Sequence, residues 1–294
     1  MRWRDLFELS VLALLWGSAY LFIRAAVPEF GPIPLMALRL ALSALVLLPL
    51  LLLRGGFSGI VRARRNLVVQ GVLFSAVPFV LLAWASLWMS AGLTAILNAT
   101  APLFAAIVAH AWLADRIGRG RALGLMIGFG GVVVLMWGRV GLRLDETAWA
   151  LVAMLVASAL WGFGGHYARL RLAGLSPVAV SVGTLAVAAM VLAPFAVATW
   201  PAEPPSLRAW AELGFLGVAS SGLGFLLYYR LLRRIGAVRA TSVTFLNPPV
   251  ALVAAALYLG EPITLQMVIG AAVILVGTAL VLGRIGPEST PTRP

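Results

Sequence analysis

The stretch PLFAAIVAHAWLAD at residues 102–115 returns in a second version, PPVALVAAALYLGE, at residues 248–261. Each stretch begins with a proline, continues through apolar residues and ends on an acidic side chain. At the same separation along the chain, Gly124 returns as Gly270. Because one separation persists across several positions, the sequence predicts two related halves.

The arginines around these stretches predict that the two halves cross a membrane in opposite senses. The loop after the first stretch carries Arg116, Arg119 and Arg121. The matching loop after the second stretch, Pro262–Met267, carries no arginine. The turn near Gly92 is uncharged, whereas its counterpart carries Arg230, Arg233, Arg234 and Arg239. Such inverted repeats are typical of secondary transporters, which bind their substrate near the bilayer midplane between the halves.

The composition of the 294-residue chain is that of a polytopic membrane protein. It is 62% hydrophobic and 11% charged, whereas soluble domains carry about 25% charged residues. A bilayer span takes roughly 20 apolar residues, and that length divides the chain into ten predicted spans. They are Leu6–Val27, Ile33–Leu53, Leu67–Met89, Leu93–Leu113, Ala122–Trp137, Ala148–Tyr167, Val178–Trp200, Ala209–Leu232, Ala237–Leu259 and Leu265–Leu282. The predicted fold class is therefore all-α, with ten transmembrane helices in two inverted five-helix repeats.

The basic residues orient these spans. The net charge is +12, and the chain contains no Lys, so Arg carries all of the basic charge. Placing the N-terminus inside puts most arginines on the cytoplasmic side, where such residues accumulate. We therefore expect an inner (plasma) membrane protein with both termini in the cytoplasm. Anionic lipid headgroups, and not nucleic acid, are the expected partners of this charge.

Enzyme and cofactor chemistry finds no support in the sequence. The chain has no Cys, which removes thiolate catalysis and Cys-ligated metals. It also lacks a Gly-rich phosphate loop with Lys, a His-rich metal cluster and a close acid pair within the spans. We expect no catalytic residue, no cofactor and no metal.

Five short motifs resemble the EamA-type transporters of the drug/metabolite transporter superfamily. They are LLWGS at residues 14–18, ALRL at 37–40, APLF at 101–104, NPPV at 247–250 and LGEP at 259–262. The resemblance covers nearly the whole chain. It implies a ten-helix exporter or permease for small metabolites, often amino acids, with a central cavity lined by spans 1–4 and 6–9. Residues 1–140 would form the first EamA-like repeat, residues 141–286 the second, inverted repeat, and residues 287–294 a disordered cytoplasmic tail.

Aromatic residues deep in the predicted spans are candidates for the cavity wall. Trp16 and Tyr20 lie one turn apart in the first span, and Trp16 returns as Trp161 in the second half. Trp84 in the third span similarly corresponds to Tyr228 in the eighth. Rings placed around the axis between the halves can stack on a planar substrate or bind a cation. Ordinary packing or lipid contact is the alternative for each of them.

Two prolines and two asparagines mark a second group of candidates. Pro102 and Pro248 are predicted to lie mid-span, where each frees a carbonyl that protein or a wet cavity must satisfy. Asn98 and Asn247 lie beside them and can supply donors for the polar groups of a substrate. The alternative, favoured for Asn98, is a fixed kink in which the amide bonds to the backbone.

Arg39 is the most informative charge, because an unpaired cation inside a span is costly and usually functional. It can hold a substrate carboxylate with both arms of its guanidinium. The alternatives are snorkelling to the headgroups or pairing with Glu29, and Arg24, nearer the surface, is expected to snorkel. His110 and His166 lie near inner span ends and can exchange protons near neutrality, although hydrogen-bonded packing is the commoner use of such residues.

The sequence therefore predicts a secondary transporter that exports small metabolites, above all amino acids or related compounds, by alternating access through an aromatic-lined cavity. No acidic residue lies mid-span, which disfavours proton exchange by a carboxylate. The alternatives are a permease for sugars, nucleotide-sugars or polyamines, and a lipid flippase or another lipid-handling membrane protein. The expected partners are a small-molecule substrate and membrane lipids, and the chain is expected to be a monomer.

Overall fold

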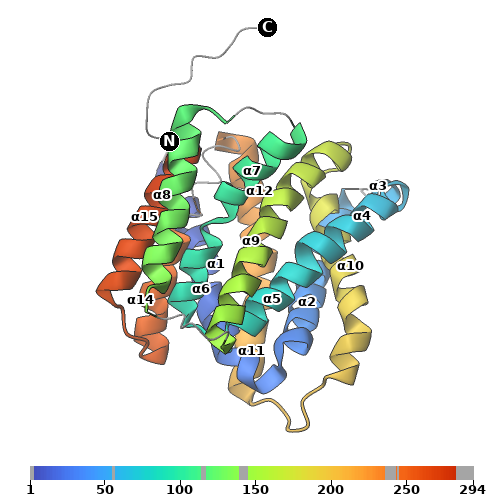
Figure 1. Ribbon diagram of the computed structural model, residues 1–294. Coiled ribbons are helices and arrows are strands. Elements are labelled where there is room, and N and C mark those ends of the chain that lie inside the picture. Colours follow the sequence, from blue (N-terminus) through green and yellow to red (C-terminus); the bar gives the residue numbers. More distant parts are fainter. Residues whose placement is uncertain are drawn as a thin grey trace, which may run out of the picture.

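The computed structural model consists of helices that run up and down along one common direction (Figure 1). It describes residues 3–54, 57–113, 117–138, 145–235, 243 and 245–282. The first half contains α1 (Trp3–Phe30), α2 (Pro32–Leu53), α3 (Phe57–Arg62), α4 (Arg64–Gly71), η1 (Val72–Ala76), α5 (Val77–Ala85), α6 (Ala91–Asn98), α7 (Ala101–Leu113) and α8 (Arg119–Met136). The second half contains α9 (Glu146–Arg171), α10 (Pro177–Ala198), α11 (Leu207–Gly214), η2 (Phe215–Leu223), α12 (Gly224–Ile235), α14 (Asn247–Leu259) and α15 (Leu265–Val281).

The predicted all-helical membrane fold is confirmed. Within the described residues, eight helical stretches are long and apolar enough to cross a membrane, and α14 and α15 are shorter apolar helices. The ninth span was predicted to begin at Ala237, and residues 236–242 lie outside the described residues; α14 forms its part from Asn247 to Leu259. The predicted tail at residues 287–294 lies outside the described residues.

The third and eighth spans each change helix type partway, at equivalent places in the two halves. The π-helical segment η1 joins α4 to α5, and the π-helical segment η2 joins α11 to α12. Pro78 lies in the first turn of α5, while η2 carries the sequence Ser220-Ser221-Gly222. Proline and Gly/Ser pairs are common sites of helix distortion, and π-helical turns shift side chains out of the ordinary helical register.

Pro102 lies in the middle of the apolar span Ala91–Trp112, as predicted. Neither Pro102 nor Pro248 kinks a continuous helix, which was the alternative considered for them. Each lies in the first turn of a new helix, because α6 ends at Asn98, α7 begins at Ala101 and α14 begins at Asn247. A proline at this position removes an N–H that has no acceptor within the helix, so it suits a helix start. The two prolines therefore lie at the starts of helices. Asn98 is the last residue of α6, and Asn247 is the first residue of α14.

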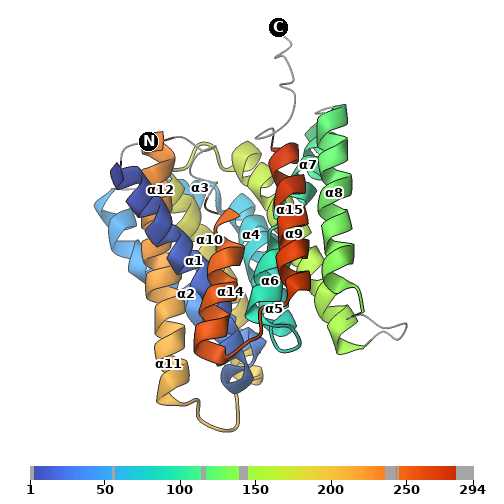
Figure 2. The ribbon, with the colours of Figure 1, turned by 90° about the vertical axis from the view of Figure 1, so that its left-hand side faces the viewer.

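The two halves make matching contacts, as an internal repeat predicts (Figures 1 and 2). Helix α1 packs on α14 and α12, and its counterpart α9 packs on α7 and α5. Gly17 lets α1 approach Val250 and the carbonyl oxygen of Asn247, and its counterpart Gly162 lets α9 approach the backbone of Ala105. Across the halves, α2 pairs with α10 and α8 pairs with α15.

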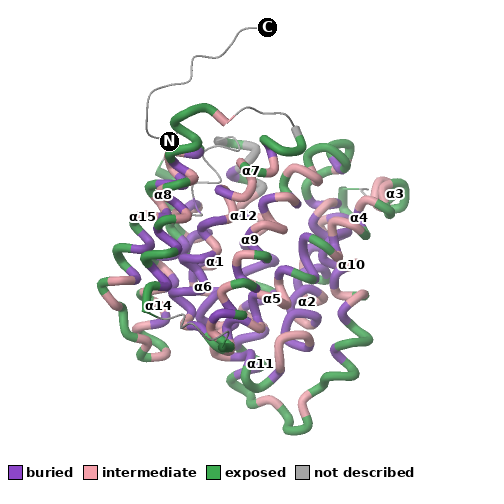
Figure 3. The backbone as a smooth tube through the Cα atoms, in the orientation of Figure 1, coloured by how far each residue is buried: buried purple, intermediate pink, exposed green. Residues whose placement is uncertain are grey.

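The outer surface of the bundle suits lipid. Buried residues concentrate between the helices, while exposed residues lie on the outer faces and at the ends (Figure 3). Large apolar side chains such as Leu53, Met126 and Leu257 are exposed there. Exposed apolar area of this extent is unfavourable in water and matches the hydrocarbon of a bilayer.

Candidate substrate cavity

A cavity of about 290 Å³ lies between the two halves. Its walls come from α1, α2, α5 and α6 of the first half and from α9, η2, α12 and α14 of the second. The lining residues are Trp16, Ala19, Tyr20, Ile23, Arg39, Phe79, Leu82, Asn98, Trp161, Ser220, Ser221, Phe225 and Asn247. Neither α8 nor α15, the fifth and tenth spans, lines this cavity, and the family resemblance likewise implies a cavity lined by spans 1–4 and 6–9.

Two aromatic pairs form opposite walls of the cavity. The ring of Trp16 meets that of Phe225 edge-on at 5.9 Å between centroids, and Trp161 meets Phe79 edge-on at 5.4 Å. Trp161 is the repeat counterpart of Trp16, and Phe225 is the counterpart of Phe79. The indole N–H of Trp16 also donates to the carbonyl oxygen of Ser220 at 3.1 Å. Each pair thus joins a tryptophan of one half to a phenylalanine of the other, in a geometry that aromatic rings favour.

Arg39 is the one charged residue among those that line the cavity. It is only 6% exposed, and its Nε donates to the hydroxyl of Ser221 at 3.3 Å. The guanidinium carbon lies 4.8 Å from the centre of the Phe79 ring. Nη1 is buried and has no hydrogen-bond partner among the described residues. Because a buried charge without a counter-charge costs several kcal/mol, this end of the cavity is suited to an anionic group.

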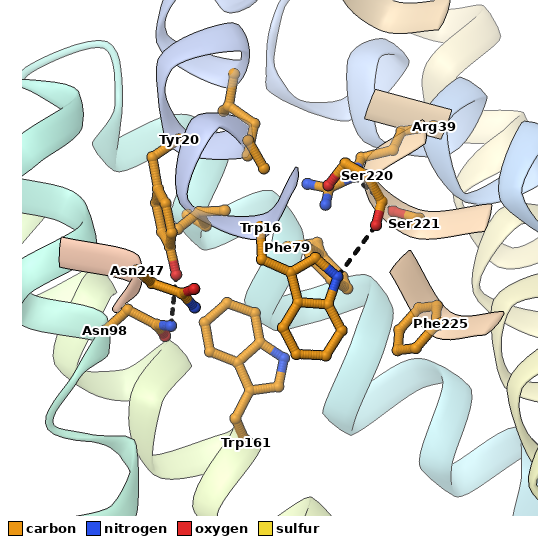
Figure 4. A pocket seen from close by; sticks show the side chains of 13 residues that line it. Trp16, Tyr20, Arg39, Phe79, Asn98, Trp161, Ser220, Ser221, Phe225 and Asn247 are labelled. Atoms are coloured by element: carbon orange, nitrogen blue, oxygen red, sulfur yellow. Dashed lines mark hydrogen bonds between the residues drawn. The ribbon is translucent and has the colours of Figure 1, made fainter. Parts of the chain in front are cut away.

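A neutral polar cluster lies across the cavity from Arg39. Asn98 donates from Nδ2 to the hydroxyl of Tyr20 at 2.6 Å. The Oδ1 atoms of Asn98 and Asn247 are buried and have no partner within the part of the chain that is described. Figure 4 shows Tyr20, Asn98 and Asn247 on one side of Trp16 and Arg39 on the other. The cavity therefore has a positively charged end, an aromatic middle and an end that carries hydrogen-bond acceptors.

The structure brings some of the predicted site residues together and leaves others outside. Those that line the cavity are Trp16, Tyr20, Arg39, Asn98, Trp161 and Asn247. Those outside its lining are Trp84, Pro102, His166, Tyr228 and Pro248. Tyr228 packs on Trp16 with 5.4 Å between ring centroids, and Trp84 packs on the helical core. Nε2 of His166 lies 2.9 Å from the carbonyl oxygen of Ala105, which ties α9 to α7.

One expectation and two alternatives about charged side chains are wrong. Arg24 does not reach out to headgroups, because its Nη1 donates to two carbonyl oxygens just after α5, at 2.7 and 3.1 Å. It also lies 3.8 Å from the carboxylate of Glu261. Glu29 does not pair with Arg39, because its carboxylate accepts from the backbone N–H and hydroxyl of Ser206. Arg39 is likewise too deeply buried to snorkel.

Seven lining residues were not predicted from the sequence: Ala19, Ile23, Phe79, Leu82, Ser220, Ser221 and Phe225. A signal for the two phenylalanines is present, because they are separated by the same distance along the chain as Pro102 and Pro248. Ser221 carries the same signal, because Ser75 is its counterpart at that separation, whereas the counterpart of Ser220 is Phe74. The two lining serines face the cavity from η2, where the π-helical register departs from the 3.6-residue period of an ordinary helix.

Comparisons with known proteins agree with this architecture. A model of the EamA-like transporter family matches residues 6–137 and 148–283. The chain is 28% identical to the uncharacterized inner membrane transporter YedA of Escherichia coli (strain K12), over 100% of this chain and 96% of that protein. It is 26% identical to a probable terminal-alkyne amino-acid exporter of Streptantibioticus cattleyicolor, over 99% and 98% of the two chains.

Two further matches extend the comparison. The uncharacterized protein PA1977 of Pseudomonas aeruginosa is 31% identical over 95% of each chain. A solved crystal structure superposes with a TM-score of 0.68 at 19% sequence identity, over 96% of this chain and 98% of the other. At that identity, the superposition shows a shared fold.

Proposed function

This chain belongs to the EamA-like transporter family, and from that premise we propose that it exports amino acids or related small carboxylates. Membership makes the chain a multi-pass membrane transporter of small molecules and not an enzyme. The observation that carries the proposal is the Arg39 guanidinium, which is buried beside an aromatic cavity and has an Nη1 atom without a partner among the described residues.

A carboxylate is the group that best complements Arg39. The guanidinium presents a planar fork of donors that matches the two oxygens of a carboxylate. Phe79 and Ser221 hold this fork from two sides, so little side-chain freedom remains to be lost when an anion binds. Once an anion is bound, the charge of Arg39 is compensated in the interior of the protein.

The rest of the cavity suits a small and partly apolar molecule. Its volume of about 290 Å³ lies just below the roughly 300–1,000 Å³ range of drug-sized ligand sites. Trp16 and Trp161 offer ring faces and edges to an apolar segment. A polyamine would bring positive charge toward Arg39, a sugar would leave the guanidinium without a counter-charge, and a nucleotide-sugar or a lipid exceeds the available volume.

We further propose an inner-membrane location with both termini in the cytoplasm. Helix α1 begins, and α15 ends, at the same end of the bundle (Figures 1 and 2). The arginine-bearing start of α4 and end of α9 lie toward that end as well, and cytoplasmic ends are enriched in Arg. Two repeats, residues 1–140 and 141–286, would rock about the cavity as in other inverted-repeat transporters. A single chain contains every lining residue, which supports a monomer as the transporting unit.

Transport by purified protein in proteoliposomes tests this proposal. Vesicles are loaded with one unlabelled compound, and counterflow of the labelled compound is measured for leucine, hexanoate, glucose and putrescine, with a fluorescent phospholipid for lipid transfer. We expect counterflow of hexanoate and none of glucose, putrescine or the phospholipid; leucine shows whether an ammonium beside the carboxylate is tolerated. The Arg39→Gln variant should lose the hexanoate flux, whereas Arg65→Gln, which removes an exposed arginine of α4, should keep it.

The outcomes separate the alternatives. Counterflow of glucose or putrescine that survives Arg39→Gln would assign the chain to the sugar or polyamine permeases and overturn the proposal. Lipid transfer without solute counterflow would make it a lipid-handling protein. Equal carboxylate flux in the wild type and Arg39→Gln would remove Arg39 from the binding site.

A further inference from the structure

We propose that the substrate carries a hydrogen-bond donor at the end remote from its carboxylate, so that one molecule reaches from Arg39 to Asn98 and Asn247. The inference rests on the proposed function and narrows its substrate class. It selects ω-substituted carboxylates, such as ω-amino or ω-hydroxy acids, over α-amino acids that have an apolar side chain.

The two polar ends of the cavity belong to different groups of helices. Arg39 lies on α2 and bonds to Ser221 of η2. Asn98 is the last residue of α6 and Asn247 the first of α14, and these two helices pack on each other. Helix α1 runs between the two groups, and its Trp16 stands between Arg39 and the asparagines (Figure 4). A ligand that contacts both ends must therefore extend past the rings.

The asparagine end offers two buried oxygen acceptors to a ligand donor. Asn98 directs its amide N–H toward the hydroxyl of Tyr20, which leaves Oδ1 free to accept. Oδ1 of Asn247 is buried as well, in a side chain that is only 7% exposed, and neither oxygen has a partner in the described chain. A buried acceptor without a donor costs about 1–3 kcal/mol. A ligand donor that reaches both oxygens would remove this cost, which favours its binding.

An α-amino acid fits this arrangement poorly. Its ammonium and carboxylate share one carbon atom, so a carboxylate on Arg39 would hold the ammonium close to the guanidinium. The two positive charges repel each other, and the effect is strong where the surroundings are shielded from water. The asparagine oxygens would remain without a donor. Several methylene groups between the two polar ends remove both problems and lie against Trp16 and Trp161, whose rings also attract a nearby cation.

A chain-length series tests the inference on the purified full-length protein. Affinity is measured by calorimetry for glycine, 3-aminopropanoate, 4-aminobutanoate, 5-aminopentanoate and 6-aminohexanoate, with the matching hydroxy acids and unsubstituted alkanoates. We expect affinity to pass through a maximum at an intermediate length. At that length the substituted acid should bind about tenfold more tightly than the alkanoate, the effect of one good hydrogen bond in a buried site. The better of the amino and hydroxy series identifies the donor as an ammonium or a hydroxyl.

Three variants assign the effect to the asparagine end. Asn98→Leu and Asn247→Leu should lose the tenfold gain of the substituted acid over the alkanoate of the same length. Arg65→Gln, which changes an exposed residue of α4 outside the cavity lining, should keep the gain. Thermal unfolding without ligand shows which variants fold. If a variant does not fold, the affinities of the wild type for the chain-length series still test whether the substrate carries a remote donor.

Failure of this inference differs from failure of the proposed function. If α-amino acids bind best, or if alkanoates bind as tightly as the ω-substituted acids, the remote donor is refuted while carboxylate binding at Arg39 stands. If no carboxylate binds in a manner that depends on Arg39, the proposed function itself is refuted.

Discussion

The two halves of this transporter agree in the aromatic residues of the cavity and differ in its charge. Each half supplies the tryptophan of one edge-to-face pair and the phenylalanine of the other. Helix α2 begins at Pro32 and α10 at Pro177, and the same separation relates Arg39 to Thr184. Arg39 faces the cavity with a positive charge, whereas Thr184 is neutral, buried and outside its lining. The residues that repeat therefore form the aromatic walls. Arg39, which is not repeated because its counterpart is Thr184, gives the cavity its charge.

The difference lies in side-chain chemistry and not in the backbone. Gly217 leaves room for Leu42 of α2, and its counterpart Gly71 leaves room for Val187 of α10. Helix α2 packs on η2, just as α10 packs on η1. The difference between Arg39 and Thr184 at equivalent positions is enough to give one side of a near-symmetric cavity a positive charge. Variants that make the halves more alike, or less alike, therefore test this comparison.

The largest effect is expected for Arg39→Thr, which gives the first half the residue that the second half has at this position. It removes charge-assisted hydrogen bonds to a carboxylate, worth about 1.5–3 kcal/mol, so affinity for hexanoate should fall by roughly 100-fold. Calorimetry on the purified variant measures the loss. Arg39→Lys keeps the charge and loses the planar fork of donors. A hexanoate affinity between those of the wild type and Arg39→Thr would confirm that the shape of the guanidinium contributes to binding. Unchanged affinity in Arg39→Thr would show that the polar difference between the halves has no part in binding.

The two matched glycines should respond alike, because they lie in the symmetric part of the molecule. Gly17→Ala and Gly162→Ala each place a methyl group 2.5–2.7 Å from atoms of the opposing helix. Overpacking of this kind costs typically about 1–3 kcal/mol, so both variants should unfold at a lower temperature in detergent. Gly165→Ala on α9 meets no atom within 4 Å and gains helix propensity; it should be at least as stable as the wild type. If only one of Gly17→Ala and Gly162→Ala lowered the unfolding temperature, the two helix contacts would not be equivalent, which would contradict the repeat.

A smaller and again symmetric effect is expected at the aromatic walls. Trp16→Leu and Trp161→Leu each remove one edge-to-face pair, worth about 0.5–1.5 kcal/mol beyond the area buried. The alkyl chain of the ligand also loses contact with the ring, worth about 0.8 kcal/mol for each buried CH₂ group, so hexanoate affinity should fall by roughly threefold to tenfold in both variants. Phe225→Leu and Phe79→Leu, which remove the partner rings, should act similarly in binding measurements. A loss confined to one Trp–Phe pair would mean that the ligand contacts one wall of the cavity and not the other.

The smallest effect is expected for Thr184→Val, which alters the counterpart of Arg39. Its hydroxyl oxygen is buried and has no partner among the described residues, so an isosteric methyl group removes no hydrogen bond. Unfolding temperature should stay the same or rise slightly, and hexanoate affinity should stay within about twofold, because replacing an unpaired buried polar group is close to neutral or stabilising. A tenfold loss of affinity would place Thr184 in the binding site and remove the asymmetry.

Much of the fold follows from the sequence, because its causes are local. Apolar runs of bilayer length predicted the spans, and residues that return at one separation, such as Gly124 and Gly270, predicted the two related halves. The change of helix type in η1 and η2 was not predicted, because π-helical turns depend on how whole helices pack. The prolines were placed mid-helix because the spans were divided by length alone, and length does not show where one helix stops and the next starts.

The candidate site was predicted only in part, because its composition depends on which helix face turns inward. Trp16 and Trp161 were found through the repeat, and both line the cavity. Trp84 was chosen as a deep aromatic residue with a counterpart in Tyr228, although Phe79 on the same span is the residue that faces inward. The partners of Arg24 were missed for a different reason. Glu261 lies in the other half of the chain, and only the fold brings it to 3.8 Å.

The most direct test of the account asks whether Arg39 recognises the carboxylate itself. Affinities of hexanoate and hexanamide are measured by calorimetry for the wild type and for Arg39→Thr, which forms a cycle that isolates this one contact. The account predicts that the amide binds the wild type roughly 100-fold more weakly than the acid, and that Arg39→Thr distinguishes the two by less than about threefold. The same loss in both proteins would contradict it, because the carboxylate would then be recognised elsewhere.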